Sequence, residues 1–134
     1  MASPIASSLH ITPVTTYQLK SAFINLPKLI FNNDPQWIAP LVAERRMHLS
    51  KLNPYFKHAK WMSWIAYSND QPVGRISAQI DQLYLERYPD KTGFFGFFDV
   101  VDNIHIAQQL LKTAEQWLIE QGMSAVRGPY SLTI

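Results

Sequence analysis

The hydrophobic pattern changes its period twice between residues 93 and 129. Residues 94–101 form an almost unbroken apolar run, FFGFFDVV, which is typical of a strand buried on both faces of a partly parallel sheet. We therefore expect this strand to be central in its sheet and not at an edge.

After this run the apolar residues recur at helical spacing. The predicted apolar face carries Ala107, Leu110, Leu111, Ala114, Leu118 and Gln121. Asp102 or Asn103 can cap the first turn with a side-chain oxygen, and Gly122 stands where a left-handed residue would end the helix. A short strand is expected at residues 125–127, so the segment predicts a βαβ crossover.

The N-terminal part of the chain predicts a strand followed by two helices. Leu9–Val14 alternates apolar and polar residues and contains a proline, which favours an edge strand. Residues 17–26 follow the helical period behind a threonine cap, and Pro27 interrupts them, with a kinked turn over residues 26–30 as the way in which the helix could continue. We expect a loop anchored by a buried Trp37, and then a second helix at residues 41–52.

The middle of the chain predicts an antiparallel hairpin. Trp61–Ser68 and Pro72–Asp81 are strand-like runs joined by a polar turn at residues 69–71. On the second run the alternation predicts one packed face and one polar face. The packed face holds Gly74, Ile76, Ala78 and Ile80, and the polar face holds Arg75, Ser77, Gln79 and Asp81. Residues 84–92 are polar and contain a proline, so we expect a loop there.

Composition sets bounds on the class of protein. A chain of 134 residues with 47% hydrophobic residues predicts a single domain over residues 1–134. The absence of cysteine excludes disulfides, thiolate zinc sites and a cysteine nucleophile. A net charge of +2 with intermixed signs gives no basic surface for nucleic acid. Neither a signal peptide nor an apolar run of roughly 20 residues is present, which predicts a cytoplasmic protein with no membrane partner.

Candidate reactive groups each have a structural alternative. Asp99 and Asp102 could form a carboxylate pair for acid–base chemistry, but a strand end and a helix cap are commoner roles. The four histidines lack short metal-ligand spacing, so we predict no metal site. Gly96 either accommodates packing or marks a β-bulge that splays the central strand from its parallel neighbour. Five aromatic residues line a ligand pocket or belong to the core: Trp37, Tyr55, Phe56, Trp61 and Trp64.

The predicted order of elements, β-α-α-β-β-β-α-β, resembles the α/β fold of GNAT-type acyltransferases with its mixed sheet. The strings LPKLIFNNDPQWIAPL, NPYFKHA, PVGRISAQID, TGFFGFFDVVDN and GMSAVRGPYS are similar to an uncharacterised bacterial family of GNAT-like proteins. The likeness covers nearly the whole chain from about Tyr17 onward. Family members are typically much longer, so the resemblance implies a partial GNAT-like domain, truncated after the fifth strand and lacking its last helix and strands.

The resemblance also implies a place for coenzyme A. GNAT enzymes bind its pyrophosphate at the start of the helix after the central strand, through the pattern Gln/Arg-x-x-Gly-x-Gly/Ala. Aligning the helix leucines sets residues 102–107 on this pattern, and only Ala107 matches it. Asp102 and His105 replace the first position and the first glycine, and Asp99 adds a second carboxylate. Repulsion of a diphosphate then predicts weak or absent binding of acetyl-CoA or another acyl-CoA.

The resemblance implies that six residues bind the cofactor: Phe98, Val100, Val101, Asn103, His105 and Ala107. The implied function is transfer of an acyl group from coenzyme A to an unknown amine, with backbone donors near Val100 stabilising the oxyanion. The catalytic residues stay unassigned. The alternatives are a non-catalytic GNAT-derived ligand-binding domain and a homo-oligomeric assembly module.

A partner is predicted from the same likeness. A GNAT sheet that ends at residues 125–127 leaves its last strand without the neighbour that normally follows, and such an edge recruits another chain. We therefore expect a homodimer in which residues 128–134 pack against the equivalent segment of a second copy.

Overall fold

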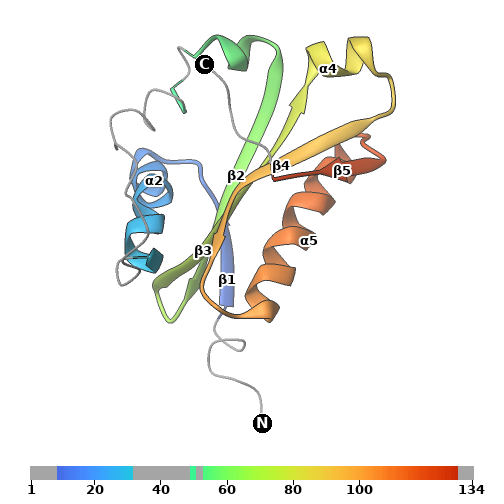
Figure 1. The fold of residues 1–134 in the computed structure, drawn as a ribbon. Coiled ribbons are helices and arrows are strands. Elements are labelled where there is room, and N and C mark those ends of the chain that lie inside the picture. The colour runs from blue at the N-terminus through green and yellow to red at the C-terminus, as the bar shows by residue number, and fades with distance from the viewer. Residues whose placement is uncertain (1–8, 32–48, 51–52, 130–134) are drawn as a thin grey trace.

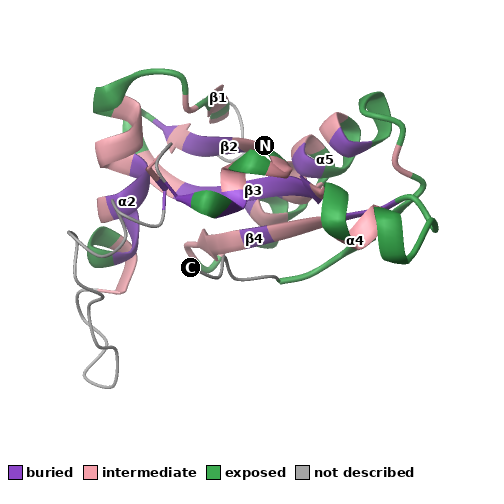
Figure 2. Cartoon of the chain, turned by 90° about the horizontal axis from the view of Figure 1, so that it is seen from above, coloured by how far each residue is buried: buried purple, intermediate pink, exposed green. Residues whose placement is uncertain are grey.

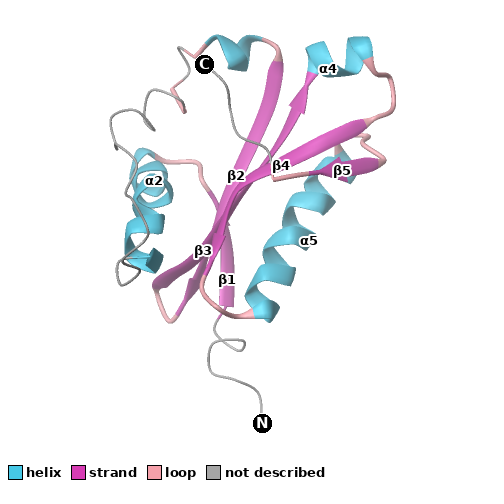
Figure 3. Cartoon of the chain, in the orientation of Figure 1, coloured by secondary structure: helices cyan, strands magenta, loops and turns pink. Residues whose placement is uncertain are grey.

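The computed structural model describes residues 9–31, 49–50 and 53–129. These residues form a five-stranded sheet with helices on its two faces (Figures 1 and 3). The elements are β1 (Leu9–Pro13), α2 (Tyr17–Phe31), the 3-10 helix η1 (Pro54–Lys57), β2 (Ala59–Ser68), β3 (Gln71–Asp81), α4 (Gln82–Arg87), β4 (Thr92–Val100), α5 (Ile104–Glu120) and β5 (Ala125–Arg127). The predicted Trp37 loop and most of the predicted helix at residues 41–52 lie outside the described residues.

The strands follow one another across the sheet in chain order, β1-β2-β3-β4-β5. The prediction of an edge strand at the N-terminus is confirmed, because β1 pairs only with β2 within the described sheet. The predicted hairpin is also confirmed as the antiparallel pair β2–β3. Its turn has two central residues, Asn69 and Asp70, both with positive φ (50° and 64°), which is the backbone shape that matches the twist of paired strands.

The βαβ crossover is confirmed, because β4 pairs in parallel with β5 after α5. Asn103, one of the two predicted caps, begins the helix, and Gly122 follows its end with φ +91°. Ile106 is fully buried where the predicted apolar face had Ala107, which is only half-buried. Leu110, Ala114 and Leu118 of the predicted face are buried, whereas Leu111 is only half-buried and Gln121 is exposed.

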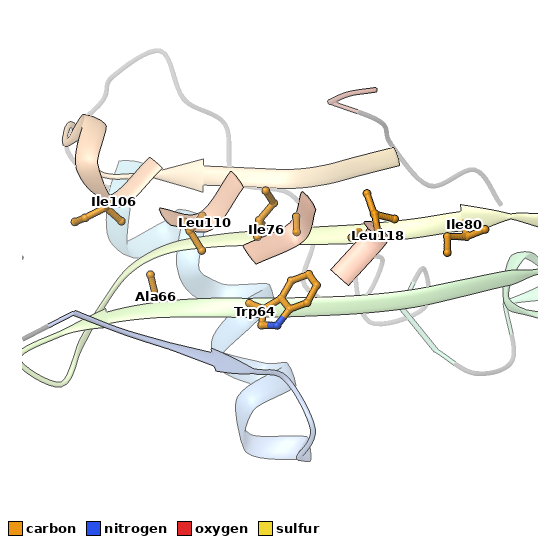
Figure 4. Close-up of a cluster of buried hydrophobic side chains, with 9 residues drawn as sticks. Trp64, Ala66, Ile76, Ile80, Ile106, Leu110 and Leu118 are labelled. Atoms are coloured by element: carbon orange, nitrogen blue, oxygen red, sulfur yellow. The ribbon is translucent and has the colours of Figure 1, made fainter. Parts of the chain in front are cut away.

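Helix α5 packs on one side of the sheet, which we call the α5 face (Figure 4). The buried cluster holds Trp64 and Ala66 of β2, Ile76, Ala78 and Ile80 of β3, and Ile106, Leu110, Ala114 and Leu118 of α5. Two glycines allow this close approach. A Cβ on Gly74 would lie 2.7 Å from Leu110 Cδ1, and one on Gly93 would lie 2.6 Å from Leu118 Cδ2. Side chains at these positions would push the helix off the sheet.

The opposite side of the sheet, the α2 face, holds the predicted polar face of β3, and this face is packed as well. Arg75, Ser77 and Gln79 are 5%, 0% and 0% exposed, so β3 is buried on both faces (Figure 2). Helix α2 and its cluster around Phe23 cover them. The alternation of polar and apolar residues shows which side chains share a face of the strand, but it does not show whether that face is exposed to solvent. Here the polar face is buried as well.

Strand β4 and the segment before it also differ from expectation. The predicted loop at residues 84–92 contains most of α4, which Asp81 caps by accepting bonds from Leu83 N (2.9 Å) and Tyr84 N (3.4 Å). Strand β4 lies between β3 and β5 as predicted, but most of its side chains are only half-buried. The strand that is buried on both faces is β3.

Helix α2 continues through Pro27 to Phe31, so the predicted interruption is wrong. Proline has no N–H, and in a helix it leaves the carbonyl of the residue four positions earlier without its donor. That carbonyl belongs to Phe23, and Arg75 Nη1 of β3 donates to it at 2.8 Å. A side chain from the sheet therefore replaces the missing helical hydrogen bond.

No helix within the described ranges is long and apolar enough to cross a membrane. The three residues of β5 are exposed, and no further strand pairs with β5 among the described residues. The homodimer through residues 128–134 stays a prediction, because residues 130–134 are outside the described part of the chain.

We predict that Arg75→Met destabilises the fold by about 3 kcal/mol, near the lower end for breaking a buried ion pair. The variant leaves the Asp99 carboxylate and the Phe23 carbonyl without Arg75, and urea unfolding measures the loss. The double variant Arg75→Met with Asp99→Leu is the control and should recover part of it. A single-variant loss below about 1 kcal/mol would contradict a central role for this contact.

Candidate functional site

A β-bulge interrupts the pairing of β4 with β3. Arg75 pairs with Asp99 and Ser77 pairs with Gly96, so Phe97 and Phe98 together oppose one residue of β3. Phe97 has φ +46°, an uncommon conformation for a bulky residue. The β4 bulge, defined as Phe97–Phe98, follows the predicted position Gly96 directly, and the register shift lies on the β3 side of β4.

The two residues of the bulge point to opposite faces of the sheet. Phe97 packs in the α2-face cluster, and Phe98 packs against the α5-face cluster with its ring 6.0 Å from that of Phe95. On the other side of β4, pairing with β5 covers only Thr92–Phe94. Residues 96–100 of β4 therefore have no strand partner on their β5 side within the described residues.

A groove of about 600 Å³ lies at the turn from β4 into α5, and we call it the β4–α5 groove. Its lining residues are Ile30 and Phe31 of α2, Val100 of β4, Val101, Asp102 and Asn103 of the turn, and Ile104 and Ala107 of α5. Four of the six predicted cofactor-binding residues line it: Val100, Val101, Asn103 and Ala107. Phe98 and His105 do not line the groove: Phe98 is half-buried against the α5-face cluster, and His105 is exposed to solvent elsewhere on the first turn.

The start of α5 already has an acceptor for its backbone donors. Asn103 Oδ1 accepts from His105 N at 3.0 Å and from Ile106 N at 3.2 Å. These are the N–H groups with which a helix start binds an anion. A phosphate at this place must therefore share or displace the asparagine oxygen.

The two candidate carboxylates are directed to different places. Arg75 binds Asp99 Oδ2 through Nε at 2.9 Å and through Nη2 at 2.8 Å, and the pair lies on the α2 face. Asp102 is exposed and lines the β4–α5 groove. The expectation of two carboxylates beside a diphosphate is therefore wrong for Asp99, whose charge is balanced. Only Asp102 remains as a repulsive group.

A second groove, of about 630 Å³, lies on the α2 face between α2 and β2, and we call it the α2–β2 groove. Its lining residues are Val14, Thr15, Thr16, Tyr17, Lys20, Phe23, Leu49, Phe56, Trp61 and Ser63. Trp61 stands edge-on to Phe56 (5.9 Å) and to Phe97 of the bulge (5.7 Å). Phe56 and Trp61 are thus pocket residues, whereas Tyr55 and Trp64 are core residues.

Sequence reasoning did not select Ser63 or the hydroxyl residues that precede α2. A serine inside an otherwise apolar strand was the available signal for Ser63. A third groove of about 720 Å³ lies between Trp64 and Trp117 and contains none of the six predicted cofactor-binding residues, although Trp64 is one of the five aromatic residues singled out above. Among the described residues no group of three metal-ligating side chains comes together.

No family model matches the chain. The chain is 47% identical over 113 residues to protein YghO of Escherichia coli, which covers 84% of the chain and 29% of that protein. It is 38% identical over 130 residues to a bacterial ceramide synthase of Caulobacter vibrioides, covering 96% of the chain and 34% of that protein. The chain thus spans about a third of the length of these curated relatives.

Solved structures with the same fold are acetyltransferases. An aminoglycoside acetyltransferase from an uncultured soil metagenomic sample superposes with TM-score 0.62 at 17% identity, over 95% of this chain and 80% of that one. A tandem GNAT protein from the clavulanic acid biosynthesis pathway superposes with TM-score 0.67 at 14% identity, over 88% of this chain and 35% of that one. The protein therefore has a GNAT-type fold.

We predict that Asn103→Ala destabilises the protein by about 1 kcal/mol, the usual effect of losing a helix N-cap. Thermal or urea unfolding measures the change, and Asn103→Ser, which keeps an oxygen acceptor, is the matched control. An alanine variant as stable as the serine variant would show that the asparagine cap contributes nothing, and that these N–H groups are available without cost.

Proposed function

We propose that the protein is an N-acyltransferase that takes an acyl group from coenzyme A. The observation that carries the proposal is the β4 bulge together with residues 96–100 of β4, which have no strand partner on their β5 side among the described residues and end in the β4–α5 groove. An extended thioester arm needs a free strand edge to pair with, and its diphosphate needs a helix start. The GNAT-type fold supports the same reading.

In this proposal the donor lies along β4. The pantetheine arm pairs with the backbone of residues 98–101, and the diphosphate reaches the start of α5 beside Asn103 and Ala107. Ile30, Phe31 and Ile104, the last 75% exposed, supply apolar contacts at the groove. The His105 side chain does not line the groove, so its part in holding the donor is limited to its backbone N–H at the start of α5.

The reaction needs little covalent chemistry from the protein. A neutral amine attacks the thioester carbonyl, the C–N bond forms, the C–S bond breaks, and the amine proton leaves while the thiolate departs as coenzyme A thiol. Backbone N–H groups near Val100 stabilise the oxyanion that forms on the carbonyl. No described side chain is assigned as general base.

For the acceptor we propose an amine that carries an alkyl chain. The support is the 38% identity to a protein named a bacterial ceramide synthase, since a ceramide is the amide of a long-chain amine. The aromatic lining of the α2–β2 groove suits such a chain. The structural neighbours are far lower in identity and bear only on the fold.

Calorimetric titration with acetyl-CoA and palmitoyl-CoA tests donor binding, and release of coenzyme A thiol in the presence of dodecylamine tests transfer. The chain has no cysteine, so a thiol reagent detects the released coenzyme A without background from the protein. Saturable binding and amine-dependent thiol release are expected. A folded protein that binds neither thioester would overturn the proposal.

We predict that Asp102→Asn strengthens binding of coenzyme A roughly threefold at low salt, because one exposed carboxylate is removed from beside the diphosphate. The gain should disappear at about 1 M salt, where screening is nearly complete at this distance. Glu115→Gln removes the same charge from an exposed position farther along α5 and should leave affinity unchanged. An unchanged affinity for Asp102→Asn would show that the diphosphate binds elsewhere.

One observation favours the assembly alternative as a second function. The three residues of β5 are exposed, and their outer edge has no partner within the described sheet. We propose a homodimer through β5 and residues 128–134 that buries at least about 1,000 Å². Sedimentation at micromolar concentration should give twice the chain mass of 15.4 kDa. A single species at the chain mass, with the amides of β5 protected from exchange, would reject the dimer.

A further inference from the structure

A pair of buried polar side chains on β3 has a hydrogen-bonding capacity that the fold does not use. Ser77 and Gln79 lie on the α2 face and are both 0% exposed. Ser77 Oγ donates to Gln79 Oε1 at 3.1 Å, and Gln79 Nε2 has no hydrogen-bond partner among the described residues. The folded chain therefore shields this amide from water.

A buried amide without its partner lowers stability, and cores normally avoid it. An apolar side chain of similar volume would fill this position without that cost. The cross-strand neighbour of Gln79 is Trp61, a residue whose apolar contacts a leucine or methionine would serve equally well. The unused amide therefore needs a reason other than packing.

The α2–β2 groove lies beside this pair. Two of its lining residues, Trp61 and Ser63, are the cross-strand partners of Gln79 and Ser77 in the β2–β3 register. Directly opposed residues on one face of a sheet stand roughly 5 Å apart at their Cβ atoms. Trp61, which is half-buried, therefore belongs to the groove lining and is also the neighbour of Gln79, and its ring contacts Phe97 of the β4 bulge.

We propose that the α2–β2 groove binds an amphiphile with a hydroxyl group at its inner end, and that Gln79 pairs with this hydroxyl once the Trp61 ring moves aside. The alkyl chain lies against Phe23 and Phe56, and the hydroxyl end lies toward the bulge. The identity of this ligand as the acyl acceptor, an amino alcohol, rests on the proposed function. Binding itself does not.

The chemistry of the amide selects a hydroxyl over other groups. In the conformation described, the unused amide atom is a donor, and after a 180° turn of the amide it would be an acceptor. A hydroxyl donates and accepts, so it satisfies the amide in either orientation. A methyl group or a bare alkyl end satisfies neither.

The experiment uses two probes of equal chain length, 2-amino-1-decanol and decylamine, below their micelle concentrations and without coenzyme A. Calorimetry measures both affinities, and tryptophan fluorescence locates the ligand. The wild-type chain should bind the amino alcohol about fivefold more tightly, which corresponds to one neutral hydrogen bond. Gln79→Met should bind both probes equally and should unfold at a higher temperature, because the unpaired amide is gone.

Matched variants identify the groove. Trp61→Phe should abolish the fluorescence response, whereas Trp64→Phe, on the opposite face of β2 against α5, should retain it. Gln79→Leu gives a second apolar replacement if the methionine variant fails to fold.

The inference is overturned if no probe binds saturably, if the hydroxyl preference survives in Gln79→Met or Gln79→Leu, or if neither variant folds, since Gln79 is then structural. Amphiphile binding without any binding of coenzyme A would uphold the groove and overturn the proposed acyltransferase.

Discussion

The guanidinium of Arg75 holds together the three elements on which both grooves depend. Arg75 belongs to β3, the middle strand of the sheet. Its guanidinium donates to the carbonyl of Phe23 in α2 and binds Asp99 of β4 through two nitrogens. Its Cζ lies 4.9 Å from the ring centroid of Phe23 and 5.2 Å from that of Phe97. A cation between two ring faces gains from their quadrupoles when water is excluded.

The location of these contacts connects the helix with the bulge. Pro27 deprives Phe23 of its helical donor, so α2 is complete only where Arg75 reaches it. Asp99 follows the bulge directly, so the same guanidinium holds the strand where its register shifts. Phe23 lines the α2–β2 groove, and Val100, the residue after Asp99, lines the β4–α5 groove. One side chain therefore sets the distance between the two candidate binding sites.

The amino-acid sequence was sufficient to predict the elements whose signals are local. The hairpin, the edge strand, the crossover, the cap at Asn103 and the stop at Gly122 all follow from turn chemistry or periodicity. The failures have a common cause, which is compensation from a distant element. In the sequence Pro27 indicates a helix break, because the donor that replaces its missing N–H is Arg75, 48 positions away. Arg75 in turn resembles a solvent-facing residue, because its acceptors lie on α2 and β4.

The candidate site was predictable to the same extent. Four of the predicted residues line the groove: Val100, Val101, Asn103 and Ala107. They could be predicted because the start of the helix is determined by local sequence signals. The packing of Phe98 against the α5-face cluster depends on the bulge, which adds one residue and so reverses the side that each later residue faces. The balanced charge of Asp99 and the unused amide of Gln79 depend on tertiary contacts that no pattern along the chain reports.

The glycine contacts of α5 have a consequence for changes in chain length. Leu110 fits against Gly74, and Leu118, two turns later, fits against Gly93, so the helix is located on the sheet at two points. An insertion or deletion in residues 101–103 would rotate the helix by about 100° per residue and move both leucines away from the glycines that they contact. The Asn69–Asp70 turn carries no such constraint, and it is exposed. Sequence length should therefore vary at the hairpin tip, where a label or tag is tolerated, and stay fixed between β4 and α5.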